Sequence, residues 1–336
     1  MRLAAGVLAL TVAGAPALAQ LRAERGGNAW TIDTGAVRCV IDDRNYVRSL
    51  ALPDGRELMA DVPERGPGYF DVVTLPIESE ARGGNYCRFG HHLPAKPLML
   101  RCDEQMVHLA LVTDESGRDP DNRLHAPLRI EAHYVFTPDL AGFYFFAILR
   151  HTDALPDLVI HQVRHMMRCN QELFTHWRLS EERAGELAPW EQFQQAETIA
   201  DATFQLPNGR IVTKYQMLRQ LSDGPVYGMT GDGGSVGLWI VEAGKDYHTG
   251  GPTKQNLTIQ NGAMLMNEPL NAHCMGPAAL LPVEGEWARL FGPWLYLATT
   301  GTSHEQQWQQ ALARAGAEER AWPYEWCAEA VGDSLY

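Results

Sequence analysis

The sequence predicts an all-β fold, a large antiparallel β-sandwich with one C-terminal helix. Three observations support this prediction. Short runs of alternating apolar and polar residues recur between residues 29 and 297, turn-forming residues separate these runs, and no helical periodicity interrupts them. A nucleotide-binding α/β fold would need helices between its strands, and the pattern excludes it. With 336 residues, the chain is long enough to bury a sizeable core.

The first residues predict a secretory signal. Arg2 precedes a largely apolar run over residues 3–13, and residues 17–19 (Ala-Leu-Ala) have the small-x-small pattern of a cleavage site. The run is too short to span a bilayer as a helix. We therefore expect residues 1–19 to be removed and the mature protein to be secreted or periplasmic, without a membrane partner.

The predicted strands differ in their expected burial. Residues 107–111 and 128–136 alternate between apolar and polar, which is typical of strands with one buried face. Residues 142–149 and 237–241 are almost continuously apolar, which predicts strands buried on both faces. Turn sequences such as residues 53–55 (Pro-Asp-Gly) separate neighbouring strands.

One helix is predicted near the end of the chain. Ser303 is its expected N-cap, with Gln306 as the capping-box partner three residues later. Apolar residues then recur at helical spacing, and Pro323 is expected to stop the helix.

The charge balance restricts the partners of the protein. The chain has 41 acidic and 28 basic side chains and a formal net charge of -13. This argues against binding to nucleic acid or anionic lipid, both of which require a basic surface. An acidic ligand would need a local basic patch. Six widely spaced cysteines without a CxxC motif argue against structural zinc, and disulfides and free buried thiols remain equal alternatives.

The densest polar cluster of the sequence runs from Lys214 to His273. Alternation over residues 211–216 predicts a strand with Val212, Lys214 and Gln216 on one face, so Lys214 should project from a sheet. A solvated surface lysine is the plain alternative, although only four of the basic residues are lysines. The glycine-rich stretch that follows lacks the phosphate-loop pattern and predicts a tight connection between strands.

A second basic cluster lies upstream, in a predicted strand over residues 158–168. Arg164 and Arg168 would lie about 13 Å apart on one face, at about 3.3 Å per residue. That separation suits successive carboxylates of an acidic polymer, which arginine binds in bidentate fashion. The alternative is that they pair with Glu172, Glu181 or Glu182. The arginine face is expected to include Leu158, Ile160, Gln162 and Met166, and the opposite face His161 and His165.

A series of short motifs follows in order along the chain, and a Gly-Tyr-Phe-Asp segment at residues 68–71 precedes them. Together they resemble the rhamnogalacturonan lyases of polysaccharide lyase family 4, over nearly all of the mature chain. The motifs are DATFQLPNG (201–209), KYQ (214–216), GLWI (237–240), TGGPTKQNLT (249–258), GEW (285–287), FGPW (291–294) and WPY (322–324).

The resemblance implies a fold and a reaction. The catalytic domain of this family is a β-sandwich of the galactose mutarotase type, and it cleaves rhamnosyl-(1,4)-galacturonate bonds of the pectin rhamnogalacturonan I by β-elimination. Lys214 matches the catalytic lysine of the family, and His273 matches its catalytic histidine. Arg164 and Arg168 match two arginines upstream of the lysine.

Further residues complete the expected site. Tyr247, His248 and Lys254 are added as substrate-binding candidates, with Tyr247 and His248 as substitutes for His273. The residue types fit β-elimination, because arginines can neutralise the uronate carboxylate while a carbanion forms beside it. A lysine with a lowered pKa can take the C5 proton, and a histidine can protonate the leaving oxygen. No cofactor is expected, and nothing in the sequence indicates calcium.

The chain departs from the family at its C-terminal end. Family members usually continue past the Trp-Pro-Tyr segment into two further β domains, whereas this sequence stops at Tyr336. We therefore expect a signal (1–19), a catalytic sandwich domain (20–302), and a helix with a truncated linker (303–336) toward absent C-terminal domains. The leading hypothesis is a secreted monomeric lyase acting on rhamnogalacturonan I. The alternatives are a non-catalytic carbohydrate-binding remnant of such a lyase and, more distantly, a sugar epimerase of similar fold.

Overall fold

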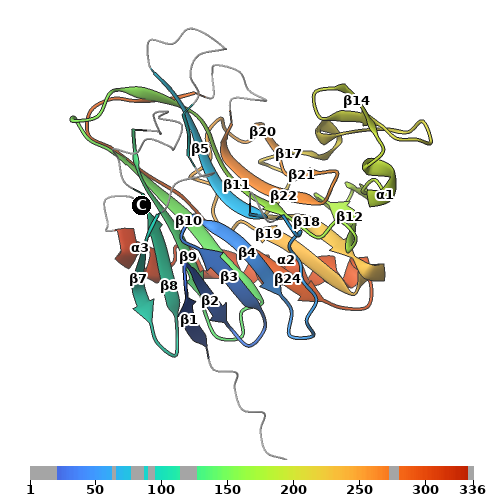
Figure 1. Ribbon diagram of the computed structural model, residues 1–336, viewed down its shortest axis with the longest axis horizontal. Helices are drawn as coiled ribbons and strands as arrows, with labels where there is room; N and C mark the ends of the chain where they lie inside the picture. Colours follow the sequence, from blue (N-terminus) through green and yellow to red (C-terminus); the bar gives the residue numbers. More distant parts are fainter. Residues whose placement is uncertain are drawn as a thin grey trace, which may run out of the picture.

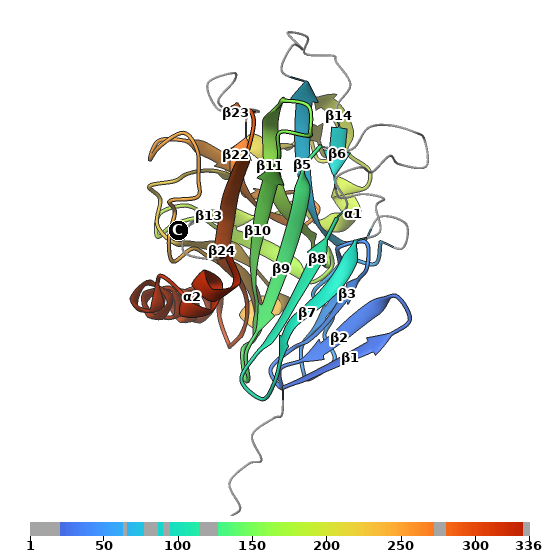
Figure 2. The ribbon, with the colours of Figure 1, turned by 90° about the vertical axis from the view of Figure 1, so that its left-hand side faces the viewer.

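The computed structural model describes residues 21–62, 66–76, 87–89, 95–113, 127–271 and 280–331. Two large antiparallel sheets pack face to face in this part of the chain, and the helices lie outside them (Figures 1 and 2). The predicted all-β sandwich is therefore confirmed. No helix within these ranges is long and apolar enough to cross a membrane.

The first sheet has ten strands. Its order is β1-β2-β3-β4-β5-β11-β22-β21, with β6 paired to β5 and β23 paired to β11. Strands β5 and β11 are neighbours near the centre of this sheet, and Arg164 and Arg168 both lie on β11. The strands are β1 (Arg22–Gly26), β2 (Ala29–Asp33), β3 (Arg38–Asp42), β4 (Tyr46–Ala51), β5 (Gly68–Pro76), β6 (Cys87–Phe89), β11 (Leu158–Arg168), β21 (Ile259–Gln260), β22 (Met264–Asn271) and β23 (Leu281–Val283).

The second sheet has nine strands, in the order β13-β12-β18-β19-β24-β10-β9-β8-β7. The strands are β7 (Lys96–Cys102), β8 (Val107–Val112), β9 (Arg129–Phe136), β10 (Gly142–His151), β12 (Phe174–Arg178), β13 (Ala184–Glu186), β18 (Val226–Gly231), β19 (Val236–Val241) and β24 (Trp287–Thr300).

The main core lies between the two sheets. Phe70 and Val163 of the first sheet pack in one cluster with Phe145, Leu238 and Tyr296 of the second. Burial of this apolar surface is the main stabilising contribution to the sandwich. The thiols of Cys39 and Cys169 are free and buried within this core. For these two cysteines, the alternative of free buried thiols is therefore correct.

The outer face of the second sheet is also buried. Helices α2 (His304–Ala321) and α3 (Glu325–Val331) follow β24, and Trp308 and Trp326 form a second apolar cluster with residues of this sheet. The two-sided burial predicted for residues 142–149 and 237–241 is thereby confirmed. The one-sided burial predicted for residues 128–136 is wrong for His133 and Val135, which this outer cluster covers.

The predicted helix is α2, and its N-cap is correct. The Ser303 hydroxyl accepts a hydrogen bond from the Gln306 amide at 3.2 Å. The reciprocal half of the capping box is wrong, because the Gln306 side chain accepts from the Thr302 amide at 2.7 Å instead. The helix ends at Ala321, just before Pro323, and the short helix α3 then adds an element that the sequence pattern did not indicate.

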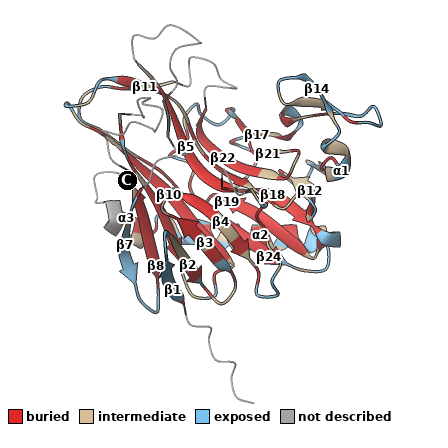
Figure 3. Ribbon diagram, viewed as in Figure 1, coloured by how far each residue is buried: buried red, intermediate tan, exposed pale blue. Residues whose placement is uncertain are grey.

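A small lobe projects from one side of the sandwich, and many of its residues are exposed or half-buried (Figures 1 and 3). Leu218 and Leu257 of the lobe pack against Tyr69, Met166 and Met266, so the lobe partly covers the outer face of the first sheet. Its elements are α1 (Trp190–Phe193), β14 (Glu197–Ala200), β15 (Thr203–Gln205), β16 (Ile211–Thr213), the 3-10 turn η1 (Lys214–Met217), β17 (Leu218–Gln220) and β20 (Gln255–Leu257); a second 3-10 turn, η2 (Asp232–Gly234), joins β18 to β19.

The predicted strand over residues 158–168 is confirmed as β11, but its alternation changes phase. Relative to β5, β11 has one extra residue between Ile160 and Gln162, which is a β-bulge. Leu158 and Ile160 therefore face the main core. The prediction that they share a face with the arginines is wrong.

Candidate functional site

Arg164 is bound to a buried carboxylate on the neighbouring strand. Arg164 of β11 and Asp71 of β5 are partners in the antiparallel register, so their side chains lie on the same face. The guanidinium donates to both carboxylate oxygens, from Nε at 3.1 Å and from Nη2 at 2.5 Å. Asp71 is fully buried and also accepts from Gln162 Nε2 at 3.2 Å. Asp71 is thus the bidentate partner of Arg164, and the alternative that Arg164 pairs with Glu172, Glu181 or Glu182 is wrong.

A second buried carboxyl group faces the same guanidinium. Glu268 of β22 is 1% exposed, and its Oε1 lies 3.9 Å from Arg164 Nη1. The Asn271 side-chain amide donates to Glu268 Oε2. Burial raises the pKa of Glu268 to about 7, while the positive charge of Arg164 opposes the rise. Glu268 is therefore poised to change its protonation state near neutral pH.

Lys254 is wholly interior. Its side chain is 0% exposed, and Nζ donates to the backbone carbonyls of Glu268 and Pro269 at 3.0 and 2.7 Å. These two hydrogen bonds connect the glycine-rich stretch over residues 249–258 to β22. In this arrangement its ammonium faces backbone oxygens and not the molecular surface.

Lys214 does not lie on a strand. Strand β16 ends at Thr213, and Lys214 begins the 3-10 turn η1, which Thr213 caps by accepting from the Tyr215 amide. The predicted common strand face with Val212 and Gln216 is therefore wrong. A capping side chain at Thr213 and a partner glutamine three residues later form a helix-start signature, and this signature overrides the alternation.

The ammonium of Lys214 is largely buried and pairs with an exposed carboxylate. Lys214 is 8% exposed, and its Nζ lies 2.8 Å from Asp201 Oδ2. The Asp201 side chain is 65% exposed and also accepts from the Tyr215 hydroxyl at 2.8 Å. The charge of Lys214 lowers the pKa of Glu268, as do those of Arg164 and Lys254, so these groups share one electrostatic environment.

Arg168 has a different environment from Arg164. Its guanidinium lies over the Tyr69 ring, 4.9 Å from the centroid, and that of Arg164 lies 5.8 Å from the same ring. Nη1 of Arg168 is buried, and within the described ranges no acceptor forms a hydrogen bond with it. Buried donors are nearly always satisfied in folded proteins, so this nitrogen marks a place for an acceptor.

Tyr247 and His248 belong to another network, centred on the fully buried Glu242. The Glu242 carboxylate lies 2.8 Å from His248 Nε2 and 3.3 Å from the Tyr247 hydroxyl, and Arg219 Nη1 donates to it at 2.8 Å. Burial disfavours the ionised carboxyl, but His248 and Arg219 hold the pKa of Glu242 well below its usual value. Asn267, the neighbour of Glu268 on β22, also donates to Glu242, at 3.1 Å. This network supports β22 from the side opposite the arginine cluster.

The structure therefore divides the expected site residues. It brings Arg164, Lys214 and Lys254 to the surroundings of Glu268, places Arg168 next along the same strand face, and assigns Tyr247 and His248 to the Glu242 network. His273 lies outside the described residues. Sequence reasoning gave no role to Asp71 and missed Glu268, although a glutamate inside an apolar strand was a usable signal. No group of three or more potential ligands for a metal ion occurs in the described part of the chain.

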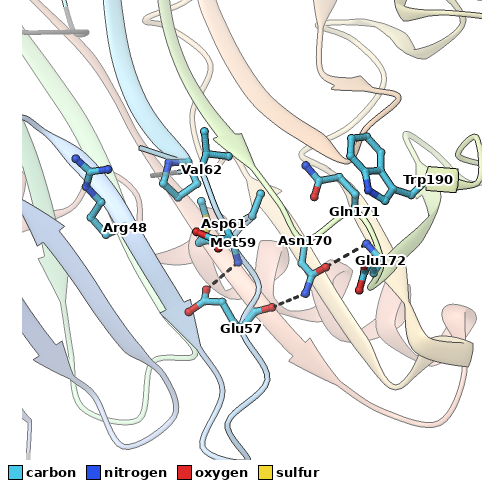
Figure 4. Close-up of a pocket in the computed structure, with 11 residues that line it drawn as sticks. Arg48, Glu57, Met59, Asp61, Val62, Asn170, Gln171, Glu172 and Trp190 are labelled. Atoms are coloured by element: carbon cyan, nitrogen blue, oxygen red, sulfur yellow. Dashed lines mark hydrogen bonds between the residues drawn. The ribbon is translucent and has the colours of Figure 1, made fainter. Parts of the chain in front are cut away.

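A cleft of about 850 Å³ opens beyond the end of β11 (Figure 4). Residues 170–172 follow Arg168 and form one side of it, together with Trp190 of the lobe. In Figure 4, Trp190 and Gln171 lie together, across the cleft from Arg48 and Val62. The lining residues are Arg48, Glu57, Met59, Ala60, Asp61, Val62, Pro67, Asn170, Gln171, Glu172 and Trp190.

Comparison with known proteins identifies related sequences. The model of the Rhamnogalacturonate lyase family matches residues 60–210, a stretch that contains Asp71, Arg164 and Arg168. The rhamnogalacturonate lyase of Dickeya dadantii is 26% identical over 242 residues, which cover 71% of this chain and 38% of the relative. Rhamnogalacturonate lyase B of Emericella nidulans is 27% identical over 179 residues, 48% of this chain and 26% of the relative. The chain thus spans well under half the length of these two relatives.

The similarity to solved structures is lower. An alpha-mannosidase from Enterococcus faecalis V583 aligns with a TM-score of 0.47 and 9% identity, over 86% of this chain and 31% of that chain. This level of similarity does not bear on function. The sequence relatives confirm what the ordered motifs predict: the chain is related to the rhamnogalacturonate lyase family.

Proposed function

We propose that this chain is the sandwich domain of a secreted rhamnogalacturonan lyase. It cleaves rhamnosyl-(1,4)-galacturonate bonds of rhamnogalacturonan I by β-elimination. Two findings support the proposal: the relatives are named rhamnogalacturonate lyases, and cationic side chains cluster on the outer face of the first sheet. The net charge of -13 makes this local basic cluster the natural place for an acidic polysaccharide.

The difference between the two arginines carries the proposal. Arg164 donates to Asp71 through two nitrogens, whereas Nη1 of Arg168 is buried and no described residue accepts from it. Leaving a buried donor unsatisfied costs about 1–3 kcal/mol, and a substrate carboxylate would supply the acceptor. In this assignment Arg168 binds the galacturonate carboxylate, and Arg164 is a positioning residue that holds Asp71 and Glu268.

Lys214 is the base in this reaction. In its neutral amine form it takes the C5 proton of the galacturonate, the electrons of that bond form a C4=C5 double bond, and the C4–O4 bond breaks. Asp201, 2.8 Å from Nζ, holds the resulting ammonium. Arg168 neutralises the carboxylate beside the developing negative charge, which is the main electrostatic demand of the transition state.

His273 donates the proton to the leaving oxygen. In the sequence it stands two residues after Asn271, the last residue of β22, whose amide binds the Glu268 carboxyl. A histidine that titrates near neutral pH suits this role.

The test is the rise in ultraviolet absorbance that accompanies unsaturated uronate ends. Debranched rhamnogalacturonan is incubated with the purified protein and, in parallel, with a longer relative. We expect Lys214→Ala and His273→Ala to lower the rate by about 10²-fold or more, as loss of an acid or base does. Lys96→Ala, an exposed lysine of β7 in the second sheet, is the matched control and should react like the wild type.

Three outcomes would contradict parts of the proposal. Full activity of both variants would show that the site residues are wrong. Absence of product from the wild type, while the relative reacts, would show that the reaction is wrong. Polymer binding without product would instead favour the alternative of a non-catalytic carbohydrate-binding protein.

A further inference from the structure

The cleft beyond β11 continues the strand face that carries the arginines. Asn170 lies two residues after Arg168, about 7 Å along an extended chain at about 3.3 Å per residue. A polysaccharide bound at Arg168 could therefore reach the cleft with neighbouring sugar units or with a branch. This connection rests on the proposed function, whereas the chemistry of the cleft depends only on its own residues.

Part of the polar lining of the cleft is already occupied. Glu57 Oε1 accepts from the amides of Leu50 and Met59 at 2.9 and 2.8 Å. The Asn170 side chain donates to the Glu57 carbonyl at 3.3 Å and accepts from the Glu172 amide at 3.1 Å (Figure 4). These two residues build the wall of the cleft and are not available to a ligand.

Other polar side chains of the cleft have spare hydrogen-bonding capacity. Among the described residues, no partner binds the side chains of Asp61, Gln171 or Glu172, all of which line the cleft. Carboxylates accept from hydroxyl groups, and a side-chain amide both donates and accepts. Together they match a ligand with several hydroxyl groups.

Trp190 supplies an aromatic surface to the same cleft. The ring is half-buried, and its Cζ3 would lie 3.7 Å from a Cβ placed on Gly262. Gly262 has a positive φ of 81°, in a turn that favours glycine, and the turn brings the backbone close to the ring. The indole therefore lies beside the backbone of this turn and lines the cleft, where an apolar face of a sugar ring could stack on it.

The charges of the cleft disfavour a uronate. Arg48 is the one basic side chain among the described lining residues, and its Nε lies 2.6 Å from Asp42 Oδ2, so its charge is already balanced. Glu57, Asp61 and Glu172 are acidic. A galacturonate carboxylate placed among them would be repelled. A cation is not favoured either, because no three acidic side chains within the described ranges are grouped as a metal site would require.

We propose that this cleft is a binding site for a neutral pyranose unit of the polysaccharide, stacked on Trp190 and hydrogen-bonded by Asp61, Gln171 and Glu172. Two chemically different positions thus recognise the polymer. Arg168 selects a carboxylate, and the cleft selects a sugar without one.

Binding of two short probes to the full chain tests this inference. The probes are a neutral galacto-oligosaccharide and a galacturonate oligomer of the same length, titrated by calorimetry. We expect Trp190→Ala to weaken binding of the neutral probe about tenfold or more and to leave the uronate probe unchanged. Arg168→Ala should have the opposite pattern.

Matched variants separate binding from folding. Trp190→Phe keeps an aromatic face and should restore most of the neutral binding. Gln171→Ala should weaken it, whereas Gln195→Ala, an exposed residue just beyond α1 and outside the cleft lining, should not. Thermal melting of each variant shows whether the sandwich is intact.

The outcomes are distinguishable from those of the proposed function. No binding of the neutral probe to the wild type, or equal loss of both probes in Trp190→Ala, overturns the inference. Loss of neutral binding on adding a chelator also overturns it, in favour of a cation site. Neutral binding that depends on Trp190 in a protein that forms no unsaturated product supports the inference while the lyase proposal fails.

Discussion

At the scale of single residues, the two arginines of β11 are chemically different although their sequence context is similar. Arg164 has a bidentate carboxylate partner on β5. Among the described residues, Arg168 contacts the Tyr69 ring, and its buried Nη1 has no acceptor. The first is therefore part of the fold, and the second is the better candidate for contact with substrate. The two roles predict different responses to mutation.

Arg164→Ala should destabilise the protein far more than Arg168→Ala. Removing Arg164 leaves Asp71 charged and unpaired in the interior, which costs about 3–5 kcal/mol. Removing Arg168 loses a stacking contact worth about 1 kcal/mol. Urea denaturation measures both changes, and the pair Arg164→Met with Asp71→Leu should recover stability. Equal destabilisation by the two alanine variants would contradict this division of roles.

Glu268 makes the free energy of unfolding fall as the pH rises, whereas an exposed ion-paired carboxyl group usually has the opposite effect. Burial raises its pKa to about 7 from 4.5, so the folded protein binds more protons than the unfolded chain between these values. Stability is therefore lost as the pH rises through this window. At about 1.36 kcal/mol per unit, the loss is about 3 kcal/mol.

Comparison with Glu268→Gln isolates this contribution. Between pH 5 and pH 8, the unfolding free energy of the wild type, measured in urea, should fall relative to that of the variant. Glu186→Gln, whose side chain is 72% exposed, serves as the control and should track the wild type. A constant difference between wild type and Glu268→Gln would mean that Glu268 is ionised throughout.

The sequence indicated the basic members of the site but not their acidic partners. Arg164, Arg168 and Lys214 could be named because basic residues are scarce and lie in recognisable motifs. Asp71 and Glu268 could not be assigned, because their importance depends on which strands pair with β11 and in which register. Such pairings join residues about 90–110 positions apart, and local patterns contain no information on them.

At the scale of elements, most strands and the main helix were predictable, and the errors have local causes. The bulge in β11 moves Leu158 and Ile160 into the core, because one extra residue reverses the alternation. Lys214 begins a 3-10 turn, because the Thr213 cap ends the strand before it. Period-two patterns describe a strand only up to the point where a bulge or cap interrupts it.

The N-cap of α2 is the clearest test of an element that was predicted correctly. Ser303→Ala removes the acceptor of the Gln306 amide and should cost about 1 kcal/mol of stability. Ser303→Asp should retain most of it, because aspartate caps equally well and also favours the helix dipole. Thermal denaturation measures both. Similar losses in the two variants would show that the hydroxyl makes no capping contribution.

At the scale of the whole molecule, buried histidines occur in both sheets of the sandwich. His165 of β11 packs against Phe145 and Trp294 in the main core, and His108 of β8 lies under the outer cluster beside His133. Burial lowers the pKa values of His165 and His108 to about 3. Both are therefore neutral in the folded protein, and both must be protonated when the chain unfolds in acid.

The sandwich should consequently lose stability as the pH falls from 7 to 4. The unfolded histidines gain protons below about pH 6.5, whereas the folded ones stay neutral, so each contributes about 3 kcal/mol that disappears over this range. Protonation of Glu268 stabilises the folded protein over the same pH range. The contribution of His165 must therefore be measured by comparing a variant with the wild type. His165→Leu keeps an apolar side chain in the core and should reduce the slope of unfolding free energy against pH by about one proton. His176→Leu, on the partly exposed face of β12, should leave the slope unchanged. If the slope of His165→Leu equals that of the wild type, this histidine is already protonated in the folded core, and the cost of its charge must be offset by a partner that its surroundings do not show.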